Sequence, residues 1–167
     1  MKKQLLVGAI LLVTGNVALA QCPIAKGQAQ LNAGVGFSNF GLPVYVGFDY
    51  GVHKDITLGA EVSFRSYNNM YVNVKYKHSV IGIAGNANYH FNSILSIPTN
   101  WDLYAGLNVG YYIYNSSGYY DGAAVSGVGV GGQIGGRYYF NEKVGINVEV
   151  GGANVGGGGK LGISVKL

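Results

Sequence analysis

The sequence predicts an all-β protein, an eight-stranded antiparallel up-and-down transmembrane β-barrel. Three observations carry this prediction. Eight segments alternate between apolar and polar residues, and most come near the ~9–11 residues that a tilted strand needs to cross a bilayer. Charged residues make up 11% of the 167 positions, against roughly 25% in a typical globular domain. Within the segments, the charges fall on one face and the large apolar side chains on the other.

The first 20 residues are predicted to be a secretory signal peptide. Two lysines precede an apolar core from Leu5 to Val13, and Ala18-Leu19-Ala20 provides the small residues that signal peptidase requires. The core is shorter than the ~20 residues of a membrane-spanning helix, which disfavours an anchor. Cleavage leaves residues 21–167 as one barrel domain and lowers the formal net charge from +4 to +2. A nucleic-acid partner is therefore not expected.

Cys22 is the only cysteine, so neither an internal disulfide nor a cysteine-based zinc site is expected. Bacterial lipoproteins carry the pattern Leu-Ala-small-Cys at this point of the chain, which this sequence resembles. Gln21 stands where that pattern has a small residue. A free or intermolecularly paired thiol is therefore favoured, and lipidation stays an alternative.

The strands follow one another along the chain, with no helix-period pattern between them. In chain order, they are expected at about 28–37, 43–51, 56–65, 80–91, 101–113, 128–140, 144–151 and 159–167. The connections predicted to point outwards cover 38–42, 66–79, 115–127 and 152–158, and the inner ones cover 52–55, 92–100 and 141–143. Longer outer loops and shorter inner turns are typical of bacterial barrels.

One face of each predicted strand is apolar. In chain order it carries Leu31, Val35 and Phe37; Val44, Val46, Phe48 and Tyr50; Ile56, Leu58, Val62 and Phe64; Ile81, Ile83, Tyr89 and Phe91; Trp101, Leu103, Leu107, Val109 and Tyr111; Val128, Val130, Ile134, Tyr138 and Phe140; Val144, Ile146, Val148 and Val150; and Leu161, Ile163, Val165 and Leu167. A soluble sheet would bury this face, whereas a membrane barrel would present it to lipid.

The opposite face carries four acids and four bases: Asp49, Glu61, Asp102 and Glu149, and Arg65, Arg137, Lys160 and Lys166. A soluble sheet could hardly bury eight charges without partners, but a closed lumen lets opposite charges pair. A soluble lipocalin-like barrel would instead have to expose them. We therefore predict a lumenal charge network, with a structural role favoured over a functional one.

The aromatic residues of the apolar face are sorted by strand direction. Phe37, Phe64 and Tyr111 come at the upper ends of the predicted strands, and Tyr50, Tyr89, Phe91, Trp101, Tyr138 and Phe140 come at the lower ends. This sorting predicts two aromatic girdles at the two membrane interfaces. It favours the arrangement in which the valines face lipid.

The predicted lumen is wide enough only for side chains. Inward-facing glycines are expected to make room for Tyr45, Tyr104, Arg137 and Tyr139. The hairpin register places Arg137 opposite Asn147 and diagonal to Glu149, within reach of a long side chain. A network that includes Glu61, Arg65, Arg137 and Glu149 follows from this register, and a wide water-filled pore does not.

A resemblance to a known family lies in the hairpin GGRYYFNEKVGINVEVG, in DITLGAEVSF at residues 55–64 and in the terminal KLGISVKL. These stretches resemble the outer-membrane β-barrel family that includes OmpX, OmpW and the OmpA barrel. The resemblance implies a Gram-negative outer-membrane location, contact with outer-membrane lipid and lipopolysaccharide, and insertion by the barrel-assembly machinery. The chain departs from the family at its end, where Leu167 stands in place of a terminal aromatic residue.

No motif for chemistry stands out. Residues 127–132 satisfy GxGxxG, but that fingerprint binds dinucleotides only between a strand and a helix, and here a strand is expected. The adjacent His78 and Ser79 point to opposite faces of one strand and cannot form a dyad by themselves. We therefore expect no catalytic, metal or cofactor site.

The predicted outer loops are rich in tyrosine and lysine. Residues 66–79 could extend two strands as a hairpin turning at Asn68-Asn69. The apolar residues of this stretch are even-numbered, whereas those of the strand that follows are odd-numbered, so a bulge or break is required near Lys77-His78-Ser79. Such a strand edge could bind a protein partner by strand addition, or lipopolysaccharide phosphates through its lysines. The candidate recognition residues are Tyr71, Lys75, Tyr76, Lys77, Tyr119 and Tyr120.

The sequence thus indicates a small non-enzymatic outer-membrane barrel with a structural or surface-interaction role, adhesion-like, through its outer loops. One alternative is a narrow channel or carrier for small or apolar solutes, in which Arg65, Arg137 or Glu149 would affect transport. The other is a lipid-modifying outer-membrane enzyme that depends on His78 or Ser79.

Overall fold

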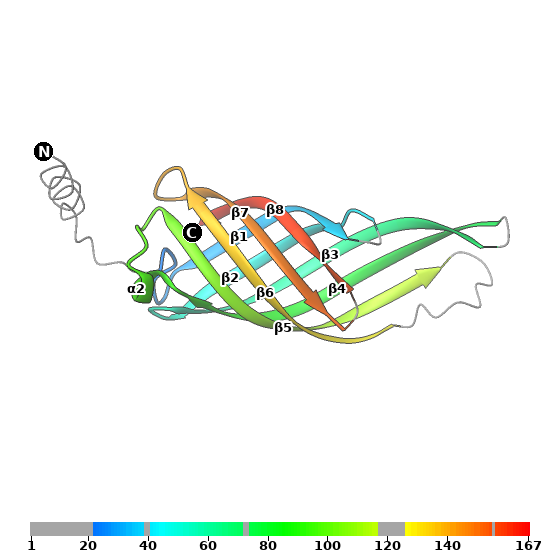
Figure 1. Cartoon of the computed structure of the whole chain (residues 1–167), viewed down its shortest axis with the longest axis horizontal. Coiled ribbons are helices and arrows are strands. Elements are labelled where there is room, and N and C mark those ends of the chain that lie inside the picture. The colour runs from blue at the N-terminus through cyan, green and yellow to red at the C-terminus, as the bar shows by residue number, and fades with distance from the viewer. Residues whose placement is uncertain (1–21, 39–40, 72–73, 117–125, 155) are drawn as a thin grey trace, which may run out of the picture.

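The computed structural model describes residues 22–38, 41–71, 74–116, 126–154 and 156–167. They form one closed barrel in which each strand pairs antiparallel with the next and the last pairs with the first (Figure 1). The strands are β1 (Ala29–Ser38), β2 (Val44–His53), β3 (Ile56–Tyr71), β4 (Val74–His90), β5 (Trp101–Ser116), β6 (Gly127–Tyr139), β7 (Val144–Ala153) and β8 (Gly156–Lys166). The predicted fold class is confirmed.

The connection between β4 and β5 contains the short helix α2 (Asn92–Leu95), which the sequence pattern did not predict. Asn92 is buried there, and its side-chain amide donates to the carbonyl of Trp101 at 2.6 Å. The helix thus closes the inter-strand connection against the start of β5. Among the described residues, no helix is both long enough and apolar enough to cross a membrane.

β3 and β4 form a two-stranded ribbon that extends beyond the rest of the barrel (Figure 1). Their register continues without a shift to the pair Tyr71↔Val74. The turn predicted at Asn68-Asn69 is therefore wrong, because both asparagines are paired within the ribbon and the chain reverses three residues later, after Tyr71.

The bulge predicted near Lys77-His78-Ser79 is also wrong, because the pairing of β3 with β4 is uninterrupted there. Even-numbered residues of β4 face inward both above and within the apolar belt, as the burial of His78 and Val80 shows. In the sequence, the apolar residues shift between odd-numbered and even-numbered positions, and this shift marks the upper edge of the lipid-facing surface. It does not mark a break in the strand.

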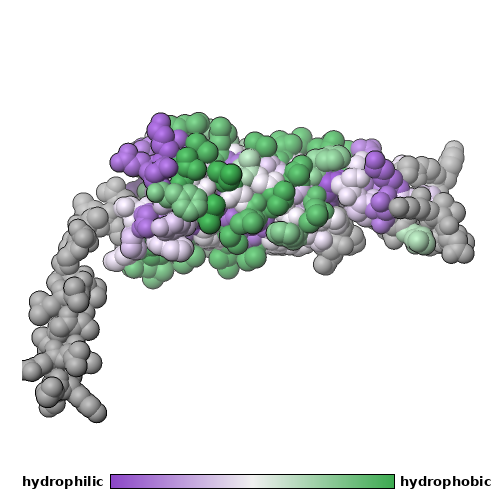
Figure 2. Space-filling model, turned by 90° about the horizontal axis from the view of Figure 1, so that it is seen from above, coloured by the Kyte–Doolittle hydropathy of each residue, from purple (hydrophilic) through white to green (hydrophobic). Residues whose placement is uncertain are grey.

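The barrel carries its apolar side chains outside. Valines, leucines and isoleucines form a broad band over the middle of the barrel, and hydrophilic residues gather toward the two ends (Figure 2). Val46 and Ile134 are each 59% exposed. The arrangement excludes a soluble barrel with the charged face outward, because an apolar exterior of this extent requires an apolar solvent.

The aromatic residues of the predicted girdles all lie on this outer surface. At the inner end, the rings of Trp101, Tyr138 and Phe140 form a continuous row, with centroids 4.7 and 5.5 Å apart. Tyr89 and Phe91 form an edge-to-face pair at 5.3 Å. Aromatic rings at this level suit the interface between hydrocarbon and water.

Glycines make room for the large side chains of the lumen, as predicted. A Cβ atom on Gly135 would overlap the ring of Tyr104, and one on Gly162 would overlap the hydroxyl of Tyr45. A Cβ atom on Gly145 would come within 2.9 Å of the ring of Tyr139. Because these glycines have no side chain, the tyrosines can fill the interior.

The variant Gly135→Ala is expected to lower the free energy of unfolding by about 1–3 kcal/mol, because the new methyl group displaces the buried ring of Tyr104. Urea titration of the barrel in lipid vesicles measures this loss. Gly132→Ala is the matched control on the same strand, since its Cβ would lie 3.6 Å from the nearest atom. Equal stability of the two variants would contradict the packing argument.

Candidate functional site

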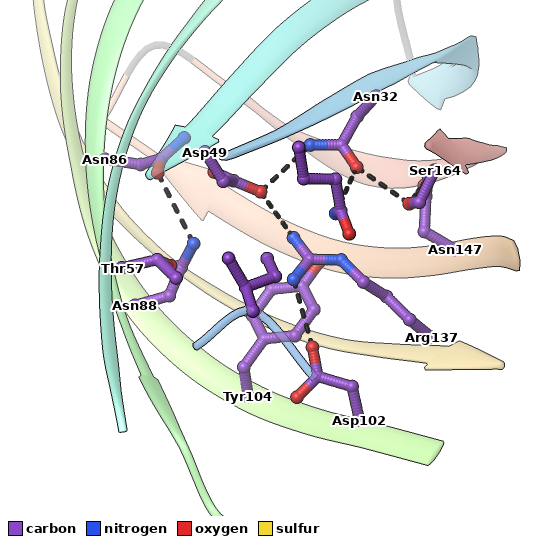
Figure 3. A network of polar contacts seen from close by, with 12 residues as sticks. Asn32, Asp49, Thr57, Asn86, Asn88, Asp102, Tyr104, Arg137, Asn147 and Ser164 are labelled. Atoms are coloured by element: carbon purple, nitrogen blue, oxygen red, sulfur yellow. Dashed lines mark hydrogen bonds and ion pairs between the residues drawn. The ribbon is translucent and has the colours of Figure 1, made fainter. Parts of the chain in front are cut away.

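The lumen is the candidate site, and Arg137 on β6 lies at the centre of its lower half. Its guanidinium donates to Asp49 on β2 at 2.6 Å and to Asp102 on β5 at 3.0 Å (Figure 3). All three side chains are at most 4% exposed. The ring of Tyr104 lies 4.3 Å from the guanidinium carbon. One cation therefore binds two buried carboxylates that come from different sides of the barrel.

Amide and hydroxyl side chains extend this cluster around the wall. Asn32 donates to Asp49 at 2.9 Å and accepts from Ser164 at 2.7 Å. Asn147 donates to Ser164 at 2.9 Å and accepts from the hydroxyl of Tyr45 at 2.6 Å. These contacts join β1, β2, β7 and β8 across the lumen. The lower lumen is therefore closed by hydrogen-bonded side chains.

The second ion cluster surrounds Lys160 on β8. Its ammonium lies 2.7 Å from Glu61 on β3 and 2.7 Å from Glu149 on β7. Tyr104 donates to Glu149 at 2.9 Å and so joins this cluster to the one around Arg137. The predicted register of Arg137 opposite Asn147 is confirmed. The pairing of Arg137 with Glu149 inferred from it is wrong, because Asp49 and Asp102 bind the guanidinium instead.

The two other lumenal cations contact tyrosines. The ammonium of Lys166 lies 3.9 Å from the ring centroid of Tyr139 at the inner end. Arg65 donates through Nη2 to the hydroxyl of Tyr114 at 3.3 Å, in the upper lumen. Among the described residues, neither cation is in ion-pair contact with a carboxylate. The eight predicted charges thus separate into two clusters, each with one cation and two carboxylates, and two cations beside tyrosines.

The segment that precedes β1 enters the inner end of the barrel. Ile24 is fully buried, and Cys22 is 3% exposed. Backbone hydrogen bonds of 2.8 and 2.9 Å join Gly27 and Gln28 to Gly51 of β2. The segment therefore covers the floor of the lumen.

Cys22, His90 and Asp102 lie together at this floor, with their ligand-type atoms within 4.8 Å of one another. Nδ1 of His90 is 2.7 Å from Asp102, and Nε2 is 3.0 Å from Thr57. Burial raises the pKa of the Cys22 thiol to about 12, with a further contribution from Asp102. The thiol is thus a poor nucleophile, and the two ring nitrogens of His90 are already bonded.

This grouping was not predicted from the sequence. Cys22 precedes the barrel, and its position depends on how the chain enters the lumen. A signal did exist for the histidine, because Asn86, Asn88 and His90 alternate on the inward face of β4. GxGxxG at residues 127–132 lies within β6, where no helix follows to bind a pyrophosphate.

Four of the six candidate recognition residues, Tyr71, Lys75, Tyr76 and Lys77, belong to the β3–β4 ribbon. Among them, Lys77 is exposed. The side chains of Tyr71 and Lys75 and the whole of Tyr119 and Tyr120 lie outside the described residues.

His78 faces inward, opposite to Ser79, so these neighbours do not form a pair. The structure instead places the hydroxyl of Ser116 on β5 2.7 Å from Nδ1 of His78. The ring of Tyr67 stacks on the imidazole at 5.0 Å. This contact joins β3, β4 and β5 where the ribbon leaves the barrel.

A closed barrel of eight strands with an apolar exterior and a polar, filled lumen defines the fold class of the small outer-membrane barrels. The chain is similar to OprG of Pseudomonas aeruginosa, with 11% identity, a TM-score of 0.65, and coverage of 87% of this chain and 99% of that one. It is also similar to Neisserial surface protein A, with 15% identity, a TM-score of 0.56 and coverage of 84% and 95%.

A third similar structure is Ail, the attachment invasion locus protein of Yersinia pestis, with 12% identity, a TM-score of 0.53 and coverage of 85% and 99%. No family model and no curated protein sequence matches the chain. At these identities the similarity establishes the fold, and the predicted resemblance to small outer-membrane barrels is confirmed at that level.

Arg137→Met is expected to lower the free energy of unfolding by about 3–5 kcal/mol, because it leaves Asp49 and Asp102 buried without their cation. Denaturant titration in lipid vesicles measures the effect. Lys143→Met, at an exposed turn, is the control and is expected to change stability little. A loss no larger than that of the control would show that the two carboxylates do not depend on Arg137.

Cys22 is expected to resist alkylation by iodoacetamide in the folded barrel at mildly alkaline pH. The raised pKa lowers the thiolate fraction by about three orders of magnitude relative to a free thiol, and burial blocks access. Mass spectrometry of the folded and urea-unfolded protein compares the two rates. Equal rates would show that the segment before β1 does not occupy the lumen.

Proposed function

We propose that the chain is exported through a signal peptide cleaved after Ala20 and inserted into the outer membrane of a Gram-negative cell by the barrel-assembly machinery. The apolar outer surface between aromatic residues supports this location. The long β3–β4 ribbon and the inner turns fit an orientation with the ribbon outside the cell and the described N-terminal segment in the periplasm (Figure 1).

In this membrane the protein acts as a non-enzymatic surface-interaction protein, and the β3–β4 ribbon is its recognition element. The observation that carries the proposal is the reach of this ribbon. Pairing of β2 with β3 ends at Phe64, whereas pairing of β3 with β4 continues for seven more residue pairs. Beyond His78, β4 has no further pairing with β5 among the described residues, so the end of the ribbon can make contacts beyond the membrane.

The ribbon also presents an apolar side chain to water. Met70 is 73% exposed near its tip, beside the exposed Asn68. Unbranched, polarisable methionine side chains are used at adaptable binding surfaces. The name of Ail, an attachment invasion locus protein, agrees with a role of this kind, and a protein on another surface is the partner we propose.

Transport through the lumen is the first alternative. It would have to displace the hydrogen-bonded clusters around Arg137 and the buried Ile24 at the floor, which disfavours conduction. A lipid-modifying enzyme is the second alternative, and the hydrogen bond between His78 and Ser116 is the observation that favours it. Catalysis by such a pair also needs an orienting group and a site for the oxyanion.

A variant in which residues 69–76 are replaced by a two-residue Asn-Gly turn tests the proposed role. The ribbon lies above the apolar belt, so the variant is expected to fractionate with the outer membrane and to migrate differently on a denaturing gel with and without boiling, like the intact protein. Adhesion of expressing cells to immobilised matrix proteins is expected to fall to the level of cells without the protein.

Lys54→Gln, at an inner turn, is the control and is expected to leave adhesion unchanged. Adhesion that persists without the ribbon would overturn its role in recognition. A soluble periplasmic protein with no heat-dependent shift would overturn the membrane location itself.

A further inference from the structure

The upper half of the lumen contains a cavity of about 150 Å³, separate from the closed lower half. Its walls come from every side of the barrel, including Ser63 and Arg65 on β3 and Tyr112 on β5. Glycines leave this space open. Gly151 on β7 and Gly158 on β8 line it, in the inward rows above Glu149 and Lys160. A Cβ atom at Gly158 would overlap the backbone carbonyl of Phe37 on the neighbouring strand.

Arg65 is a cation of this cavity that contacts no carboxylate among the described residues, unlike Lys160. Its Nε atom is buried and has no hydrogen-bond partner among the described residues. Its Nη2 atom donates to the hydroxyl of Tyr114 at 3.3 Å, a long contact. A buried donor without a partner costs free energy. A planar guanidinium binds a carboxylate through two parallel hydrogen bonds.

The other charges of the cavity contact one another. Lys160 contacts Glu61 and Glu149 at 2.7 Å each, so this group has one excess negative charge. A doubly charged phosphate would be repelled by these carboxylates more strongly than a singly charged ligand would. The cavity therefore favours a ligand with one negative charge placed at Arg65.

The remaining walls set the size and polarity of the ligand. Val80 is 2% exposed, and together with Ala84 and Pro43 it supplies an apolar surface beside the polar groups. An apolar cavity of about 150 Å³ holds one benzene ring. The space thus suits a small apolar body attached to the charged group.

We propose that this cavity binds a small monocarboxylate whose apolar body is no larger than about one six-membered ring, with the carboxylate held by the guanidinium of Arg65. The hydroxyls of Ser63 and Tyr112 line the same cavity and can donate further hydrogen bonds. This proposal does not rest on the surface-interaction role of the ribbon.

Isothermal titration of benzoate into the detergent-solubilised barrel, corrected with empty micelles, tests the proposal. The intact protein is expected to bind benzoate saturably. It is expected not to bind methyl benzoate, which lacks the charge, or benzylamine, which reverses it. Arg65→Gln is expected to weaken benzoate binding by about tenfold or more, because a charge-assisted bidentate contact is lost.

Lys166→Gln is the matched control, because Lys166 is also a lumenal cation beside a tyrosine but lies at the opposite end. It is expected to bind benzoate like the intact protein. Arg65→Lys keeps the charge without the planar fork and is expected to bind at intermediate strength. The heat-dependent gel shift verifies that each variant is folded.

Three results would overturn the proposal: no saturable binding to the intact protein, equal binding of benzoate and its methyl ester, or undiminished binding by folded Arg65→Gln. The comparison of benzoate with its ester uses the intact protein alone. It therefore decides the question even where a variant fails to fold. If benzoate binds although adhesion does not depend on the ribbon, only the proposed function fails. If adhesion depends on the ribbon but benzoate does not bind, only the present proposal fails.

Discussion

The barrel depends on the exclusion of every charge from its outer wall. Hydrocarbon cannot solvate ions or unpaired backbone groups, so the strands close on one another and the ionisable side chains share a lumen only a few side chains wide. Arg137 makes this crowding tolerable by binding Asp49 and Asp102 together. Its contacts connect β2, β5 and β6 and orient Tyr104, which reaches Glu149 in the second cluster. The interior is therefore one coupled electrostatic arrangement.

The two halves of that interior differ because large side chains predominate in the lower half and glycines in the upper half. In the lower half, Tyr104, Tyr139 and the amide side chains fill the space, and the segment at Ile24 covers the floor. In the upper half, the inward rows of β7 and β8 end in glycines, and a cavity remains. The closed half suits stability, and the open half is accessible to small molecules. One small barrel can thus combine a rigid base with a binding-competent upper end.

The β3–β4 ribbon shows how a barrel strand changes role along its length. Below Phe64, β3 is held on both sides by its neighbours, and its outward side chains are apolar. Above it, β3 and β4 continue as a pair, with His78 anchoring the ribbon to Ser116 of β5. The ribbon is therefore attached to the barrel both by strand pairing and by this side-chain contact.

The alternation of the sequence by itself determined the number of strands, their order, the lipid-facing side and the inward direction of all eight charges, because side chains of a strand must alternate between two faces. It also placed Arg137 opposite Asn147, since a short turn sets the register of its hairpin. It misplaced the turn of the β3–β4 ribbon, because above the membrane the apolar pattern no longer reports which face is lipid-exposed.

Only the tertiary structure decided which charges meet. Arg137 and Asp49 are 88 positions apart in the chain and touch because the barrel closes and its strands are staggered. The same closure brings Cys22 beside His90 and leaves Arg65 without a carboxylate beside the cavity. Alternation fixes the face on which a side chain lies, but contacts across a lumen depend on the height of each strand around the whole circumference, which no single hairpin determines.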